Sequence, residues 1–119
     1  MKDMQHSVII IDDDEDIVHL FGEFLEENGI KVVGTGYDGL TAIKLYKEKK
    51  PDVVLIDIMM PNGNGFYAIK KIQEINSKAK IIAVSGDSSY LTEEKLEKLD
   101  IPFIKKPFNM EQILSVIKA

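Results

Sequence analysis

Five short apolar runs alternate along this chain with five longer segments in which apolar residues recur at helical spacing. The apolar runs cover residues 8–11, 30–33, 53–57, 81–84 and 102–104. Short runs rich in β-branched residues are typical of strands that are buried on both faces of a sheet. Because strict alternation requires a crossover after each strand, we expect an α/β fold with a parallel sheet between two layers of helices.

The helical segments cover residues 17–25, 40–47, 66–75, 91–99 and 110–117. Three residues that commonly cap helix N-termini, Asp14, Asp38 and Asn109, precede three of these segments. The second segment stops before Pro51, and no linker, repeat or low-complexity stretch interrupts the alternation. We therefore expect a single domain over residues 1–119.

The composition of the 119 residues, 45% hydrophobic and 29% charged, indicates a globular domain that can bury a core. Cysteine is absent, which excludes disulfides and thiolate metal sites and fits a reducing compartment. No apolar run approaches the ~20 residues of a membrane span, and the polar start at residues 1–7 does not have the pattern of a signal peptide. We expect a cytoplasmic protein, and its net charge of −5 argues against direct binding to nucleic acid or a membrane.

Reactive side chains follow four of the five predicted strands. Asp12 and Asp13 follow the first strand, Asp57 ends the third, Ser85 follows the fourth and Lys106 follows the fifth. In a parallel sheet these positions all lie at the carboxyl ends of the strands, where the functional crevice of such folds is found. The topology is therefore expected to bring these side chains into one site.

Three carboxylates at one edge of a sheet repel each other unless positive charge is supplied. Lys106 offers one charge, and the oxygen-only donors Asp12, Asp13 and Asp57 suit a hard cation such as Mg²⁺. A cation beside a rigid carboxylate indicates phosphoryl transfer, with Asp57 as the nucleophile that forms an aspartyl phosphate. The hydroxyl of Ser85 would then bind a phosphoryl oxygen, and Lys106 would pair with the developing charge.

These motifs in this order resemble the receiver domain of two-component response regulators. The likeness is carried by the acid pair after the first strand, Asp57, Met60-Pro61, Gly65, Ser85 and Lys106-Pro107-Phe108, and it covers roughly residues 6–118. The resemblance implies a flavodoxin-like (βα)5 doubly wound fold, a five-stranded parallel sheet in the order 2-1-3-4-5 with helices on both faces.

The resemblance also implies roles for the acidic residues. Asp57 matches the phosphoacceptor of the family, and Asp13 matches the residue that binds Mg²⁺ directly. Asp12 matches the neighbour that usually acts through water, and Met59 stands where a backbone carbonyl completes the metal shell.

Three further residues match positions that sense the phosphoryl group in the family. Ser85 matches the switch hydroxyl, and Phe103 matches the aromatic switch residue, although a strand phenylalanine is equally well interpreted as a core residue. Lys106 matches the lysine that contacts the phosphoryl group, and the peptide between it and Pro107 is usually cis in the family.

The function that the resemblance implies is a phosphorylated signalling switch rather than an enzyme. Its phosphoryl donor would be a sensor histidine kinase, a phosphotransfer protein or a small phosphodonor. A downstream target protein would bind the face made by the fourth helix, the fifth strand and the fifth helix. The protein would be a monomer or a phosphorylation-dependent dimer, acting alone or as part of a longer regulator.

Two alternatives belong to other functional classes. A Mg²⁺-dependent phosphohydrolase with a strand-end nucleophile usually has a second Asp two residues later, and this chain has Met59 there. A pseudo-receiver would bind partners without phosphorylation, against which stands the intact set of Asp13, Asp57, Ser85 and Lys106.

Overall fold

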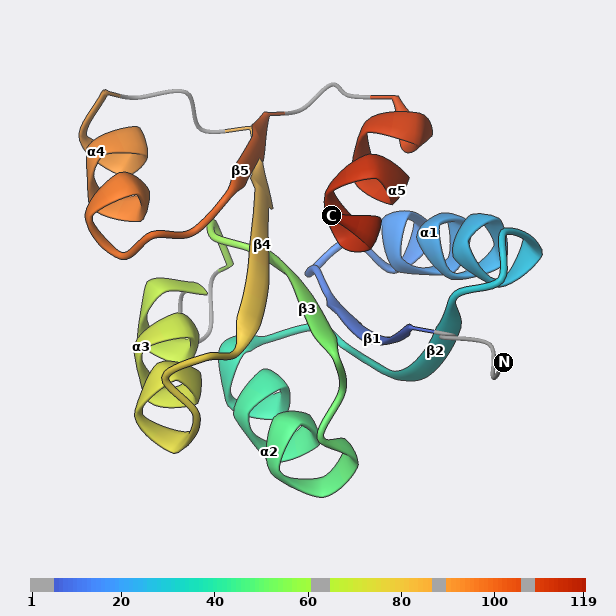
Figure 1. The fold of residues 1–119 in the computed structure, drawn as a ribbon, viewed down its shortest axis with the longest axis horizontal. Helices are drawn as coiled ribbons and strands as arrows, with labels where there is room; N and C mark the ends of the chain where they lie inside the picture. Colours follow the sequence, from blue (N-terminus) through green and yellow to red (C-terminus); the bar gives the residue numbers. More distant parts are fainter. Residues whose placement is uncertain (1–5, 61–64, 87–89, 106–108) are drawn as a thin grey trace.

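The computed structural model describes residues 6–60, 65–86, 90–105 and 109–119. Over these ranges, five strands alternate with five helices, as predicted. The elements in chain order are β1 (Ser7–Ile11), α1 (Glu15–Glu27), β2 (Lys31–Gly36), α2 (Gly39–Lys49), β3 (Val53–Asp57), α3 (Gly65–Ile75), β4 (Lys80–Ser85), α4 (Tyr90–Lys98), β5 (Phe103–Lys105) and α5 (Met110–Lys118). The strands form one parallel sheet in the order β2-β1-β3-β4-β5, which confirms the expected topology (Figure 1).

Two layers of helices cover the sheet, with α1 and α5 on one face and α2, α3 and α4 on the other (Figure 1). Alternate residues of the central strands contact opposite layers. Ile10 and Leu55 pack with α1 and α5, whereas Ile9 and Ile56 pack with α2, α3 and α4. All four side chains are buried, and burial of each stabilises the fold by about 1.5–3 kcal/mol.

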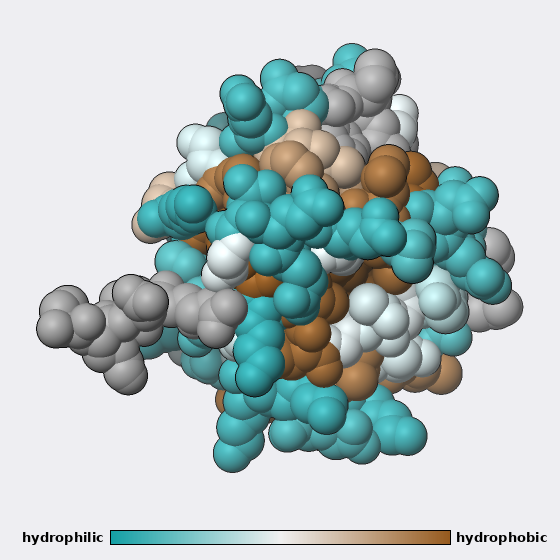
Figure 2. Space-filling view, turned by 90° about the vertical axis from the view of Figure 1, so that its right-hand side faces the viewer, coloured by the Kyte–Doolittle hydropathy of each residue, from teal (hydrophilic) through white to brown (hydrophobic). Residues whose placement is uncertain are grey.

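The outer surface combines charged helix faces with small apolar areas. On the side that carries α1, hydrophilic residues dominate and apolar residues show between them (Figure 2). No helix in the described ranges has the length and apolar character needed to cross a bilayer.

Strand β2 is longer than the sequence predicts, because it continues through Gly34 to Gly36 instead of ending at residue 33. Both glycines lie where α2 comes close to the sheet. A Cβ at Gly34 would lie 3.1 Å from a methyl group of Leu45, and one at Gly36 would lie 2.5 Å from Cγ2 of Thr41. Both glycines therefore mark close packing of α2 against the strand, and β2 ends only at Gly36.

The predicted N-caps are confirmed. Asp14, Asp38 and Asn109 each accept hydrogen bonds from backbone N–H groups in the first turn of α1, α2 and α5. At α2 the N–H of Thr41 donates to Oδ1 of Asp38 over 2.8 Å, and this bonding lowers the pKa of Asp38 below its usual 3.8. The caps fix where the three helices begin, and the cap of α1 comes directly after Asp12 and Asp13.

Two isoleucines of α3 provide a matched test of the core. Ile72 is 0% exposed and Ile75 is 45% exposed, although they lie one turn apart. We expect Ile72→Ala to lower the free energy of unfolding by about 2–5 kcal/mol, because it leaves a cavity between α3 and the sheet. Ile75→Ala should cost under about 1 kcal/mol in the same urea titration, and equal costs would contradict this assignment of the core.

Candidate functional site

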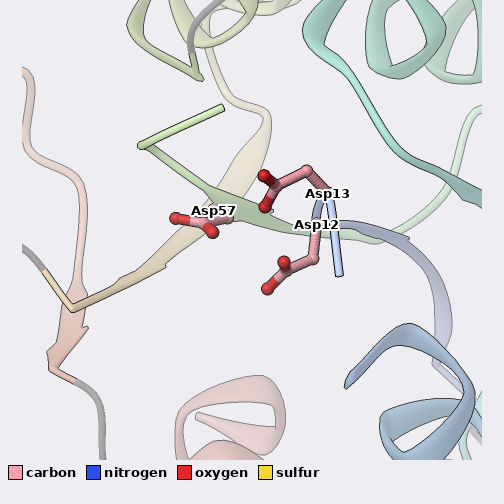
Figure 3. Close-up of side chains that lie close together, drawn as sticks. All are labelled: Asp12, Asp13 and Asp57. Carbon is pink, nitrogen blue, oxygen red and sulfur yellow. The ribbon is translucent and has the colours of Figure 1, made fainter. Parts of the chain in front are cut away.

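The candidate site lies at the carboxyl ends of the two central strands. Ile11 of β1 pairs with Ile56 of β3, and each is followed by an aspartate, Asp12 and Asp57. Asp13 extends from the same turn as Asp12. One carboxylate oxygen of each aspartate lies within 4.8 Å of the others, and Figure 3 shows the three side chains gathered at this edge. The predicted acidic group is thus formed by the strand register.

Backbone amides hold the two buried carboxylates. Asp12 and Asp57 are buried, whereas Asp13 is exposed. The N–H of Asp14 donates to Oδ1 of Asp12 over 3.0 Å, and the N–H of Met59 donates to Oδ1 of Asp57 over 3.1 Å. These two hydrogen bonds fix the orientation of both carboxylates.

Helix α3 begins in direct contact with the end of β3. The N–H of Gly65 donates to the carbonyl oxygen of Ile58 over 2.9 Å. A Cβ at Gly65 would lie 2.6 Å from the carbonyl oxygen of Asp57 and 2.6 Å from Cα of Ile58. There is therefore no room for a side chain at Gly65, where α3 meets the end of β3.

The donor set of the acidic group fits a hard divalent cation. Asp12, Asp13 and Asp57 supply carboxylate oxygens without imidazole or thiolate, which suits Mg²⁺ better than Zn²⁺ or copper. Mg²⁺ keeps several water ligands, and the exposed side chain of Asp13 gives the group an open side toward solvent. Repulsion among three close carboxylates is the physical reason to expect that a cation binds here.

Of the remaining predicted residues, Ser85 has a defined place in the sheet, whereas Lys106 does not fall within the described ranges. Ser85 is the last residue of β4, directly after Val84, which pairs with Asp57. The side chain of Ser85 lies outside the described part of the structure, so its predicted contact stays a prediction. Lys106 and Pro107 lie outside the described residues, so their predicted contacts stay predictions.

The other two predicted residues have defined places. Met59 is exposed, and its backbone lies beside Asp57 through the N–H contact described above. Phe103 pairs with Ala83 in the sheet and packs, half-buried, against the core on the α2, α3 and α4 side. This packing fits a core residue, and its predicted role as a switch stays a prediction.

Two functional contacts were missed from sequence, namely the amides of Asp14 and Met59. Each follows its carboxylate by two residues, which is the spacing of an Asx turn, so the signal was present in the sequence.

Comparisons with known proteins agree with this geometry. The chain matches the family described as response regulator receiver domain over residues 8–118. It is 34% identical to the chemotaxis protein CheY of Bacillus subtilis over 116 residues, 96% of each chain. It is also 34% identical to CheY of Thermotoga maritima over 115 residues, again 96% of each chain.

Solved structures show the same fold. The response regulator domain of Thermotoga maritima CheB aligns with a TM-score of 0.84 and 30% identity, covering 96% of this chain and 94% of that chain. A chain of the CheX-CheY-BeF3-Mg+2 complex from Borrelia burgdorferi aligns with a TM-score of 0.88 and 25% identity, covering 94% of this chain and 86% of that chain.

A glycine pair tests the close contact at the end of β3. We expect Gly65→Ala to lower the free energy of unfolding by about 1–3 kcal/mol, because the new Cβ must displace backbone atoms of residues 57 and 58. Gly22 in α1 has no atom within 4 Å of such a Cβ, so Gly22→Ala should instead raise it by about 0.5–1 kcal/mol. Urea denaturation measures both, and a neutral Gly65→Ala would refute the steric argument.

A second prediction concerns repulsion in the acidic group. In metal-free buffer we expect Asp13→Ala and the similarly sized Asp13→Asn to raise the melting temperature, because each removes one of three close negative charges. Added Mg²⁺ should then stabilise the wild-type protein more than either variant, since binding to the folded state raises stability. A loss of metal-free stability in both variants would show that repulsion does not govern this site.

Proposed function

The chain belongs to the response regulator receiver family, and on that premise we propose that it is a signalling switch phosphorylated on Asp57. One observation carries the proposal: the carboxylate of Asp57 is fixed at the end of a buried strand, within 4.8 Å of oxygens of Asp12 and Asp13. A nucleophile beside a group that suits a cation is what phosphoryl transfer onto a carboxylate requires.

In the proposed reaction, a carboxylate oxygen of Asp57 attacks the phosphorus of a phosphohistidine or an acyl phosphate. A new P–O bond forms as the bond to the leaving nitrogen or oxygen breaks, and the leaving group takes the electron pair. The N–H of Met59 orients the carboxylate through Oδ1. Because the strand already holds the Asp57 carboxylate in one place, less conformational entropy would be lost on reaching the transition state.

We propose that Mg²⁺ would be held by the carboxylates of Asp12, Asp13 and Asp57 and by the backbone carbonyl of Met59. When bound, the ion would supply positive charge that offsets the negative charge on the oxygens of the phosphoryl group and of the aspartates. Asp12 is already oriented by the N–H of Asp14, and its own N–H donates to the carbonyl oxygen of Gly36 over 3.2 Å. The side chain and the backbone of Asp12 are therefore both held in place, which would help its carboxylate to act as a metal ligand.

We assign the response to phosphorylation to Ser85, Lys106 and Phe103. The position of Ser85, next in line after the residue paired with Asp57, supports a hydrogen bond from its hydroxyl to the phosphoryl group. Lys106 would neutralise the added charge. Phe103 lies on the neighbouring strand β5 and would change its packing as the site changes.

The proposed partners are a histidine kinase or phosphotransfer protein as donor and a target protein on the face made by α4, β5 and α5. A groove of about 500 Å³ between α4 and β5, lined in part by Leu96, Ile101 and Phe103, supports a docking role for this face. Phosphorylation would shift the population of pre-existing states rather than create a new fold. We propose that the protein does this in the cytoplasm, as one domain over residues 1–119 and without catalytic turnover.

Phosphorylation can be tested directly. We expect incubation with Mg²⁺ and acetyl phosphate to add a single phosphoryl group, seen as one mass increment of the intact protein. Asp57→Asn should abolish the increment because the amide is a poor nucleophile, and removal of Mg²⁺ with a chelator should greatly reduce it.

The other outcomes separate the alternatives. Release of inorganic phosphate over many turnovers would identify a phosphohydrolase. Absence of any adduct with acetyl phosphate and with a phosphorylated kinase would identify a binding module that has lost phosphorylation. An increment that persists in Asp57→Asn would move the acceptor to another residue.

A further inference from the structure

The helices α2 and α3 carry a charge opposite to that of the whole protein. Together they contain five lysines and two glutamates, whereas the complete chain has a net charge of −5. Helix α1, on the other face of the sheet, contains five acidic residues and no lysine (Figure 1). The fold thus separates a basic side from an acidic side.

A groove of about 520 Å³ runs along this basic side between α2 and α3. It is lined by Leu40, Ile43, Lys44, Lys47, Glu48, Tyr67 and Lys71. Leu40 is 64% exposed and Tyr67 is 48% exposed, and Ile43 reaches the core beneath them. Single exposed apolar residues are ordinary, but here they gather in one concave surface with the size of a binding groove.

Three lysines border these apolar side chains. Lys44 and Lys47 lie one turn apart on α2, and no ion pair involves either of them within the described ranges. On α3, Nζ of Lys71 lies 5.7 Å from the centroid of the Tyr67 ring and 3.6 Å from Oε1 of Glu74. The latter pair is exposed and contributes little, so Lys71 is available to a competing carboxylate.

We propose that this α2–α3 groove is the docking site for an acidic, amphipathic segment of a partner protein. Apolar side chains of the segment would cover Leu40 and Ile43, and its carboxylates would pair with the bordering lysines, as in helix-in-groove recognition. The concave shape of the groove fits an inserted helix of a partner better than it fits the flat surface of a membrane. All the groove residues belong to α2 and α3, and none is part of the acidic group.

The probe is a synthetic helical peptide with leucines on one face and glutamates on the other, added to the ¹⁵N-labelled full chain. We expect amide shifts to change along α2 and α3 and fluorescence anisotropy to give a saturable affinity. Reversal of two groove charges in Lys44→Glu/Lys71→Glu should weaken binding at least about tenfold. The matched control, Lys49→Glu/Lys70→Glu, changes the net charge equally on the same helices but outside the groove, and it should retain the affinity within about twofold.

Several outcomes would overturn the proposal. Equal weakening by both double variants would show general electrostatic attraction, and unchanged binding by Leu40→Ser would remove the apolar contact. Tighter binding to phosphatidylglycerol vesicles than to the peptide would reassign the groove to a lipid surface. Concentration-dependent sedimentation of the protein alone, lost in Lys44→Glu/Lys71→Glu, would reassign it to a second copy. Tight binding of a peptide with lysines in place of glutamates would contradict the charge complementarity.

Discussion

The parallel register of β1 and β3 is the constraint on which the rest of the structure depends. Because Ile11 pairs with Ile56, the next residues of the two strands, Asp12 and Asp57, reach the same edge of the sheet. Both strands are buried on both faces, and a slip by one residue would send each side chain to the opposite helix layer. The core packing and the acidic group are therefore specified by one pairing, and neither can shift alone.

The acidic group is expected to lower the stability of the folded state. Buried carboxylates lose hydration, and three close together repel each other. The amides of Asp14 and Met59 offset part of this cost by donating to Asp12 and Asp57. Departures from an apolar interior that are locally supported in this way are expected at functional sites rather than in ordinary cores.

The α/β class and the acidic group could be predicted from local patterns and a general rule of topology, whereas the strand order was taken from the family resemblance. The extent of β2 was wrong because the meaning of Gly34 and Gly36 depends on how closely α2 approaches the strand. The basic groove was not predicted because Lys44 and Lys71 border the same groove only once α2 and α3 pack side by side. The negative net charge of the whole chain also gives no sign of a local basic surface. The role of Lys106 was predicted from its place after the fifth strand and from the family resemblance, and this residue lies outside the described ranges.

The acidic group is assembled from segments that are distant along the chain. Asp12 and Asp13 follow the first strand, and Asp57 ends the third, with α1, β2 and α2 between them. Parallel strands cannot pair until the chain between them has formed its crossover, and such non-local pairing is slow. Until the two strands pair, these carboxylates are not held together as one group. Any chemistry that depends on all three carboxylates is in this sense a property of the completed sheet.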